Sequence, residues 1–152
     1  LFTFAVPGYN VRNQELNAVL GLSQIKRLDY NIDRRVENLN IWIDSLSKEK
    51  FFVDFTIEGN SNFALPLIVL NSDKNRFIRV CDILEDNQVE YRIGTAGGGN
   101  QAKQPYLEKY DYYAGDLPNS DYIHEFALYI GNHSELKEEQ IKELCKKLNE
   151  ES

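Results

Sequence analysis

The sequence contains no methionine, one tryptophan and two cysteines, and no run of basic residues is longer than two. Its 24 acidic residues outnumber 17 basic ones, for a formal net charge of −7. The average field therefore repels a phosphate backbone, and we predict no binding to nucleic acid. No apolar stretch approaches the roughly 20 residues that a membrane-spanning helix needs, so no membrane span is predicted.

The two cysteines also limit the chemistry that the chain can carry. Neither has a neighbouring histidine or a third cysteine, so no zinc site is predicted. Cys81 and Cys145 are interpreted as reduced core thiols of a cytoplasmic protein. Phosphate-binding loops of nucleotide hydrolases, GxSxG elbows and HExxH motifs are also absent from the sequence. The start at Leu1 has neither an initiator methionine nor a basic region, and we expect it to be the interior of a longer protein.

Apolar residues recur at steps of three and four over the first third of the chain, which indicates an amphipathic helix. The stripe consists of Leu16, Val19, Leu20, Leu22, Ile25, Leu28, Ile32, Val36, Leu39, Ile43 and Leu46. Asn13 is placed to cap it, and a kink is expected at residues 29–31 because the stripe is far longer than an average helix. Its apolar surface exceeds what a small sheet can cover, so we expect it to pack against something outside this chain.

Beyond residue 50 the apolar pattern changes to that of strands and shorter helices. Strands are predicted at 51–53, 63–70, 89–93 and 126–130. A helix capped by Asn71 or Ser72 is predicted between the second and third strands, and a last helix capped by Ser134 ends the chain.

This order of elements indicates an α+β fold, an α/β sandwich in which helices cover one face of a small, mostly antiparallel sheet. Pro66 cannot donate a hydrogen bond to a neighbouring strand, which favours an edge strand or a bulge at that position. Residues 94–118 are predicted to form a long, irregular loop. We expect a division into residues 1–50, with the long helix, and a small α/β domain at 51–152.

Three short stretches could carry chemistry, and each has a plain structural interpretation as well. Residues 7–12 place an amide and an arginine before a helix start, which suits an anion, or they form an ordinary Pro-Gly turn. The glycines between Arg92 and Asn100 form either an anion-binding nest or a flexible surface loop. Residues 131–133 border a pocket or make a simple turn.

The segment from Pro7 to Leu28 resembles the "GYN-x-R … E-L-x-A-x-x-G-x-x-Q-L-x-x-L" signature of the DegT-type sugar aminotransferases. These are fold-type I enzymes that use pyridoxal 5′-phosphate (PLP) to modify nucleotide-linked keto-sugars for lipopolysaccharides and antibiotic glycosides. Residues 92–106 and 126–133 fit the small C-terminal domain of that family more loosely. They are most similar to the branch that contains the 4-keto-6-deoxy-sugar 3-dehydratases.

The resemblance implies a homodimer with a shared active site. Asn10 would bind the PLP phosphate of the neighbouring subunit, and Arg12 would line the same site. The nucleotide-sugar substrate would contact Tyr9, Arg92, Gly98, Gly99, Asn100 and His133.

The resemblance assigns no catalytic residue to this chain, because the family's Schiff-base lysine lies upstream of the matching segment. The chain by itself is therefore expected to be inactive. The full-length protein is interpreted as an aminotransferase of lipopolysaccharide or O-antigen biosynthesis. Two alternatives stay open at this point: a 3-dehydratase, which has histidine at the lysine position, and a non-catalytic module that binds a nucleotide sugar or a protein.

Overall fold

The computed structural model describes residues 14–111 and 115–151 of the chain. Its helices and strands follow the order α1 (Glu15–Ile25), α2 (Leu28–Ser45), β1 (Ala64–Ile68), α3 (Lys74–Asp86), β2 (Tyr91–Ile93), α4 (Pro118–Phe126), β3 (Ala127–Gly131) and α5 (Glu138–Glu151). Three short 3-10 helices follow β2, namely η1 (Gly94–Gly97), η2 (Gln101–Lys103) and η3 (Pro105–Lys109). The predicted α+β class is confirmed, and the long loop contains short helical turns.

The three strands form an antiparallel sheet in the order β1-β3-β2, so β3 is the central strand. Pro66 lies in β1, an edge strand, as predicted from its missing N–H group. The strand predicted at 51–53 is reduced to an isolated bridge between Phe51 and Val69. This bridge lies beyond the end of β1 and adds no full strand to the sheet.

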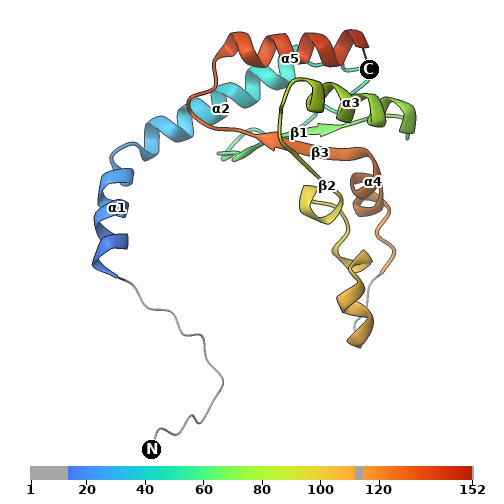
Figure 1. Ribbon diagram of the computed structural model, residues 1–152, viewed down its shortest axis with the longest axis horizontal. Coiled ribbons are helices and arrows are strands. Elements are labelled where there is room, and N and C mark those ends of the chain that lie inside the picture. The colour runs from blue at the N-terminus through green and yellow to red at the C-terminus, as the bar shows by residue number, and fades with distance from the viewer. Residues whose placement is uncertain (1–13, 112–114, 152) are drawn as a thin grey trace, which may run out of the picture.

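Helices α2, α3 and α5 cover one face of the sheet (Figure 1). Side chains alternate along a strand, so Leu65 and Leu67 of β1 share that face with Leu128 and Ile130 of β3. They pack against a buried set from the helices: Leu39, Trp42, Val80, Ile83, Leu84, Ile141, Cys145 and Leu148. Each fully buried side chain of this kind contributes roughly 1.5–3 kcal/mol to stability.

The two cysteines have different environments. Cys145 is fully buried, and burial raises the pKa of its thiol to about 12. Cys81 is half-buried, and burial raises the pKa of its thiol as well. Both thiols are free. A raised pKa keeps the reactive thiolate scarce near neutral pH. Of the two predicted core thiols, Cys145 is buried in the core and Cys81 lies at its edge.

The long helix predicted from the apolar stripe is two helices, and the predicted kink at residues 29–31 is wrong. The break falls at residues 26–27, where the Arg27 amide bonds the Gln24 carbonyl at 2.9 Å in a turn. Helix α2 follows the sheet, whereas α1 extends away from the body and buries no residue (Figure 1). The apolar surface that the sheet was expected to leave uncovered is therefore that of α1.

Two predicted helix caps are also corrected. The α3 cap is Asp73, whose carboxylate accepts a hydrogen bond from the Arg76 amide at 2.9 Å. Asn71 and Ser72 have φ angles of 62° and 52° and belong to the preceding turn. Helix α5 begins at Glu138, because Ser134 is taken up by a turn that precedes it.

A buried pair of asparagines joins α2 to the turn after β3. Asn38 and Asn132 are 0% and 3% exposed, and the Asn38 amide nitrogen lies 3.0 Å from the Asn132 side-chain oxygen. Asn132 in turn donates to the carbonyl groups of Arg35 and Asn62, at 3.0 and 2.9 Å. Because buried polar groups are costly unless paired, this network fixes one position for the turn relative to the helix.

Replacing Asn132 with alanine should lower the free energy of unfolding by about 2–4 kcal/mol, since it leaves the Asn38 amide and two carbonyl groups short of partners. Urea unfolding followed by the fluorescence of Trp42 measures this change. Asn119→Ala, at an exposed position, is the control and should change stability by less than about 0.5 kcal/mol. Equal stability of the two variants would contradict the role of the network.

Candidate functional site

The residues predicted to bind cofactor or substrate fall into three places. Tyr9, Asn10 and Arg12 lie outside the described residues. Arg92 and His133 line a common pocket. The third group, residues 98–100, lies in the loop after η1 and does not line this pocket. The structure thus unites only two of the predicted substrate contacts.

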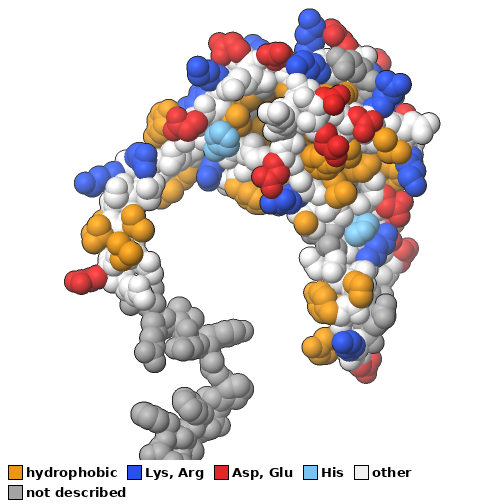
Figure 2. Space-filling model, viewed as in Figure 1, with side chains coloured by type: hydrophobic (Ala, Val, Ile, Leu, Met, Phe, Trp, Pro, Cys, Tyr) orange, Lys and Arg blue, Asp and Glu red, His pale blue; other side chains and the backbone are white. Residues whose placement is uncertain are grey.

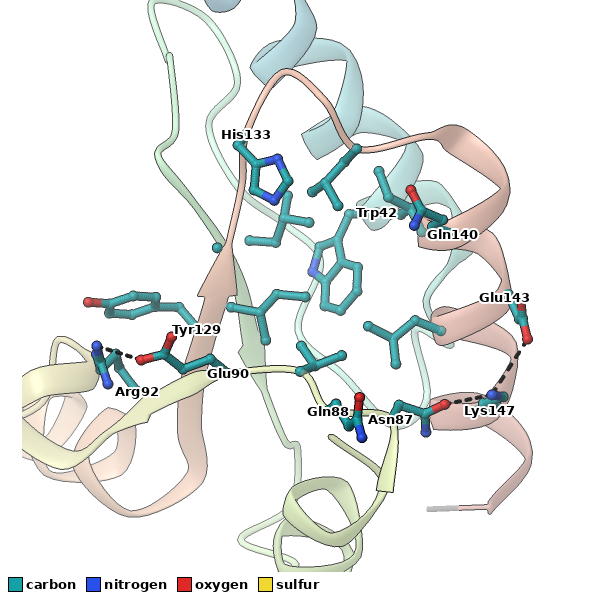
Figure 3. A pocket seen from close by; sticks show the side chains of 17 residues that line it. Trp42, Asn87, Gln88, Glu90, Arg92, Tyr129, His133, Gln140, Glu143 and Lys147 are labelled. Carbon is teal, nitrogen blue, oxygen red and sulfur yellow. Dashed lines mark hydrogen bonds and ion pairs between the residues drawn. The ribbon is translucent and has the colours of Figure 1, made fainter. Parts of the chain in front are cut away.

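The pocket has a volume of about 600 Å³ and lies between α5, the end of β3 and the segment that leads into β2 (Figure 3). Its floor is apolar and includes Trp42, Leu65, Ile130 and Ile141, which also belong to the core. The indole nitrogen of Trp42 donates to the Pro66 carbonyl at 2.7 Å, so the ring offers the pocket only carbon atoms. The polar rim consists of Asn87, Gln88, Glu90, Arg92, Tyr129, His133, Gln140, Glu143 and Lys147.

The cations on the rim are already paired with carboxylates. The Arg92 guanidinium lies 2.7 Å from Glu90, and Lys147 lies 3.5 Å from Glu143 and 2.6 Å from the side-chain oxygen of Asn87. Figure 3 shows both pairs at the edge of the pocket. The paired charges leave little positive field for a phosphate, so this pocket suits an uncharged group with an apolar body.

His133 is held at the rim by the asparagine network. Its carbonyl oxygen accepts a hydrogen bond from Asn38 at 3.1 Å, and the preceding residue is the buried Asn132. The imidazole itself is exposed and lies at the mouth of the pocket (Figure 3). Sequence reasoning proposed His133 but missed Asn38, because an asparagine in the middle of an amphipathic helix carries no signal of its long-range partner.

The glycine loop after β2 is tightly folded. Gly98 has a left-handed backbone with φ of 88°, and the amide groups of Gly98 and Gly99 both donate to the Gly94 carbonyl. A nest needs successive free amides, so these two do not form one. Neither is the loop an unstructured surface segment, because η1 packs against α4 and β3. A substrate contact at Gly98 or Gly99 stays a prediction.

Asn100 organises the chain after this loop. It is 7% exposed, donates to the Asp121 carboxylate at 2.8 Å and accepts from the Ala102 amide at 2.8 Å. The Asn100 hydrogen bond and the Lys103 ammonium at 3.1 Å lower the pKa of Asp121, and the Asp121 carboxylate in turn raises the pKa of Lys103. Both ends of the Asn100 amide are therefore occupied within the chain. Its predicted role in substrate binding stays untested.

The glycine loop packs against His124 of α4. A side chain at Gly99 would place its Cβ 2.6 Å from the His124 Cα and 2.8 Å from the Gly94 carbonyl oxygen. The His124 Nδ1 atom is buried and has no hydrogen-bond partner among the described residues. This contact could not be predicted from the sequence, because residues 99 and 124 are far apart along the chain.

Gly99→Ala should therefore disturb the loop more than Gly98→Ala, because a Cβ at Gly98 meets open space and costs only the strain of a left-handed backbone, about 1 kcal/mol. Amide hydrogen exchange of residues 94–103 measures the effect, and we expect faster exchange in Gly99→Ala. Protection that is lost equally in both variants would show that the contact with His124 does not determine the loop.

Within residues 14–111 and 115–151, no group of three histidine, cysteine, aspartate or glutamate residues could hold a metal ion. No helix in those ranges has the length and apolar character required to cross a membrane.

Comparison with known proteins gives a consistent result over the whole chain. A GDP-4-keto-6-deoxy-D-mannose 3-dehydratase of Yersinia pseudotuberculosis is 32% identical over 146 residues, which cover 94% of this chain and 37% of that protein. The enzyme of the same name from Escherichia coli O55:H7 is 29% identical over 87% of this chain. The chain thus spans little more than a third of the length of these relatives.

Solved structures share the fold. The E. coli GDP-4-keto-6-deoxy-D-mannose 3-dehydratase with bound hydrated PLP superposes with a TM-score of 0.82 at 25% identity, over 97% of this chain and 38% of that one. The aminotransferase PseC of Helicobacter pylori has a TM-score of 0.76 at 16% identity, over 97% and 40%, which shows a common fold. Residues 2–149 match the DegT/DnrJ/EryC1/StrS aminotransferase family, and the chain belongs to this family.

Proposed function

We propose that this chain is the C-terminal portion of a PLP-dependent enzyme that modifies a nucleotide-linked keto-sugar. The observation that carries the proposal is the similarity over nearly the whole chain to 3-dehydratases acting on a GDP-linked sugar, in sequence and in fold. A dehydratase structure with bound GDP-perosamine supports a nucleotide sugar as the ligand class. A Salmonella typhimurium relative, 23% identical, is named as a lipopolysaccharide biosynthesis protein, which supports a role in O-antigen synthesis.

Removal of water is the better supported of the two chemistries. The solved dehydratases have TM-scores of 0.81–0.82 at 24–26% identity, whereas the aminotransferase structures have 0.71–0.77 at 13–17%. A further relative, from Saccharopolyspora spinosa, is also named as a 3-dehydratase. Amino transfer, favoured by the sequence reasoning alone, is the second candidate and is supported by the name of the family.

The lysines of this chain do not fit covalent attachment of PLP. All of them lie in the described ranges, and none is buried. A lysine activated as a nucleophile has a lowered pKa, but the carboxylates of Asp121 and Glu138 raise the pKa of Lys103 and Lys142, respectively. Bound PLP supplies an electron sink. This chain would contribute binding groups for it and no covalent bond.

The binding groups proposed for the phosphate are Asn10 and Arg12, on the segment that leads into α1. The structure supports a helix start here, because α1 begins at Glu15. Gln14 precedes it, and the Gln14 side chain caps none of the first amides of the helix. A helix N-terminus preceded in the sequence by an amide and a guanidinium suits a dianion. In the proposed homodimer this phosphate belongs to the neighbouring subunit.

The choice between the two chemistries can be tested with the full-length protein, PLP, glutamate and GDP-4-keto-6-deoxymannose. We expect a product that has lost one hydroxyl group and carries no new nitrogen, detected by mass spectrometry. An amino-sugar product that keeps all other hydroxyl groups would establish the aminotransferase. The 152-residue chain in the same assay should show no turnover. A full-length protein that neither binds PLP nor converts the sugar would contradict the proposal.

Asn10→Ala in the full-length enzyme should weaken PLP binding by about 1–3 kcal/mol, because a charged phosphate loses one donor. Titration of the apoenzyme with PLP measures this change. Asn17→Ala is the matched control, since Asn17 is an exposed amide on α1, and its PLP affinity should be that of the unaltered enzyme. An unchanged affinity of Asn10→Ala would remove this residue from the site.

A further inference from the structure

Arg35 of α2 carries a charge that no described neighbour compensates. Its side chain is half-buried, its Nε atom is buried, and it has no hydrogen-bond or ion-pair partner within residues 14–111 and 115–151. Every other arginine of these ranges has a partner: Arg27, Arg34, Arg76, Arg79 and Arg92. A buried charged donor is costly unless an acceptor pairs with it. An acceptor for Arg35 is therefore expected outside the described residues.

Arg35 lies on the side of α2 that faces the core. Leu39 and Trp42 on that side are fully buried. Arg35 precedes Trp42 by seven residues, which at about 100° each end about 20° short of two turns, so both lie on nearly the same line along the helix. An arginine that is simply solvated belongs on the opposite, polar side of an amphipathic helix. The position of Arg35 is thus that of a residue covered by a neighbour.

The core covers only the later part of this side of α2. Leu28, the first residue of α2, precedes Trp42 by fourteen residues, which end about 40° short of four turns, and so lies on the same side. It is 49% exposed. Figure 2 shows apolar and basic side chains exposed over α1 and the first turns of α2. The apolar side of α2 therefore continues beyond the core, with Arg35 at the boundary.

Arg35 is held next to an exposed aromatic residue. The Asn132 side-chain nitrogen donates to the Arg35 carbonyl at 3.0 Å, and the Asn132 backbone amide donates to the Phe63 carbonyl at 2.9 Å. Phe63 is 67% exposed, and its ring meets that of Tyr129 edge-on, with centroids 5.6 Å apart. Arginine and aromatic residues are enriched in protein interfaces. This surface suits a polypeptide that offers a carboxylate and an apolar group.

The undescribed stretches of this chain do not supply such a carboxylate. Residues 1–13 and 112–114 contain neither aspartate nor glutamate. The relatives are much longer, since this chain spans 37% of the Yersinia protein. The start of α2 is the end of the helix that lies nearer, along the sequence, to a polypeptide preceding Leu1. Covalent linkage keeps such a polypeptide at a high local concentration, so a small contact area suffices.

We propose that Arg35 forms an ion pair with a carboxylate of the polypeptide that precedes Leu1 in the full-length protein, and that Phe63 and Leu28 pack beside this pair. A guanidinium binds a carboxylate through two parallel hydrogen bonds, which gives the contact a defined geometry. The pair fixes the start of α2 relative to the rest of the enzyme. It rests on the proposed function, in which this chain is the C-terminal portion of a longer protein, but it requires no particular reaction.

The experiment measures amide hydrogen exchange of residues 29–38 in Arg35→Met, both in the full-length protein and in the 152-residue chain. In the full-length protein, exchange should become at least about tenfold faster, because a covered carboxylate loses its partner. In the 152-residue chain, exchange should stay the same or become slower, because the substitution removes an unpaired charge. Equal acceleration in both proteins, or none in the full-length protein, would overturn the ion pair.

Arg34→Met is the matched control, because Arg34 is paired within the chain. Its guanidinium pairs with Glu37 and donates to the Leu136 carbonyl at 3.0 Å. This substitution should accelerate exchange by a similar factor in both proteins. Arg35→Lys keeps the charge but not the paired hydrogen bonds, so the full-length variant should exchange at a rate between those of the unaltered protein and Arg35→Met. Lysine that behaves like methionine would contradict a charge-based contact.

Two other sources of the acceptor give different results. A carboxylate from a second copy would make the protection of residues 29–38 in the 152-residue chain rise with its concentration. An anionic ligand would protect them in the full-length protein only when a GDP-linked sugar is added. Either result would overturn the proposal. Arg35-dependent protection in a full-length protein that fails to bind PLP would contradict only the proposed chemistry. Unchanged exchange of Arg35→Met in a protein that binds PLP would overturn only the ion pair.

Discussion

Trp42 couples the helical layer to the sheet, and the rest of the architecture depends on that contact. Its indole ring is fully buried between α2, α5 and β3, and its nitrogen donates to the Pro66 carbonyl in β1. The ring thus satisfies its only polar atom and is the largest fully buried side chain among the described residues. Because Pro66 has no amide proton, the carbonyl at this edge position is the group through which the strand can be tied to the helix.

The asparagine pair extends this constraint to the end of the sheet. Trp42 fixes the C-terminal end of α2, and Asn38, one turn earlier, fixes the turn that follows β3. The two contacts together set the angle at which α2 crosses the strands. Helix α1, which precedes α2, makes no such contact and extends away from the body (Figure 1). The placement of His133 at the pocket is a consequence of the same network.

Much of the fold could be predicted from periodicity, since the apolar faces of α2, α3 and α5 repeat at helical spacing and the edge position of Pro66 follows from its chemistry. The break at residues 26–27 could not, because the apolar stripe continues through it and no proline marks it. The α3 cap was misplaced by two residues at most, because Asn71, Ser72 and Asp73 are all good capping residues.

The candidate site was less predictable, for a physical reason. Glycines such as Gly98 and Gly99 indicate an unusual backbone conformation, but the sequence does not show whether their amides bind a ligand or bond within the loop. Here both amides donate to the Gly94 carbonyl. The residues that shape the loop, His124 and Asp121, are brought in by tertiary contacts. The charged groups on the pocket rim differ from the apolar side chains of α1. The rim charges are paired within this chain, whereas the apolar side chains of α1 need another surface to cover them. A site completed by a second subunit would leave that difference: a pocket with paired charges on the body, and an apolar helix that projects from the body and follows the segment proposed to bind phosphate.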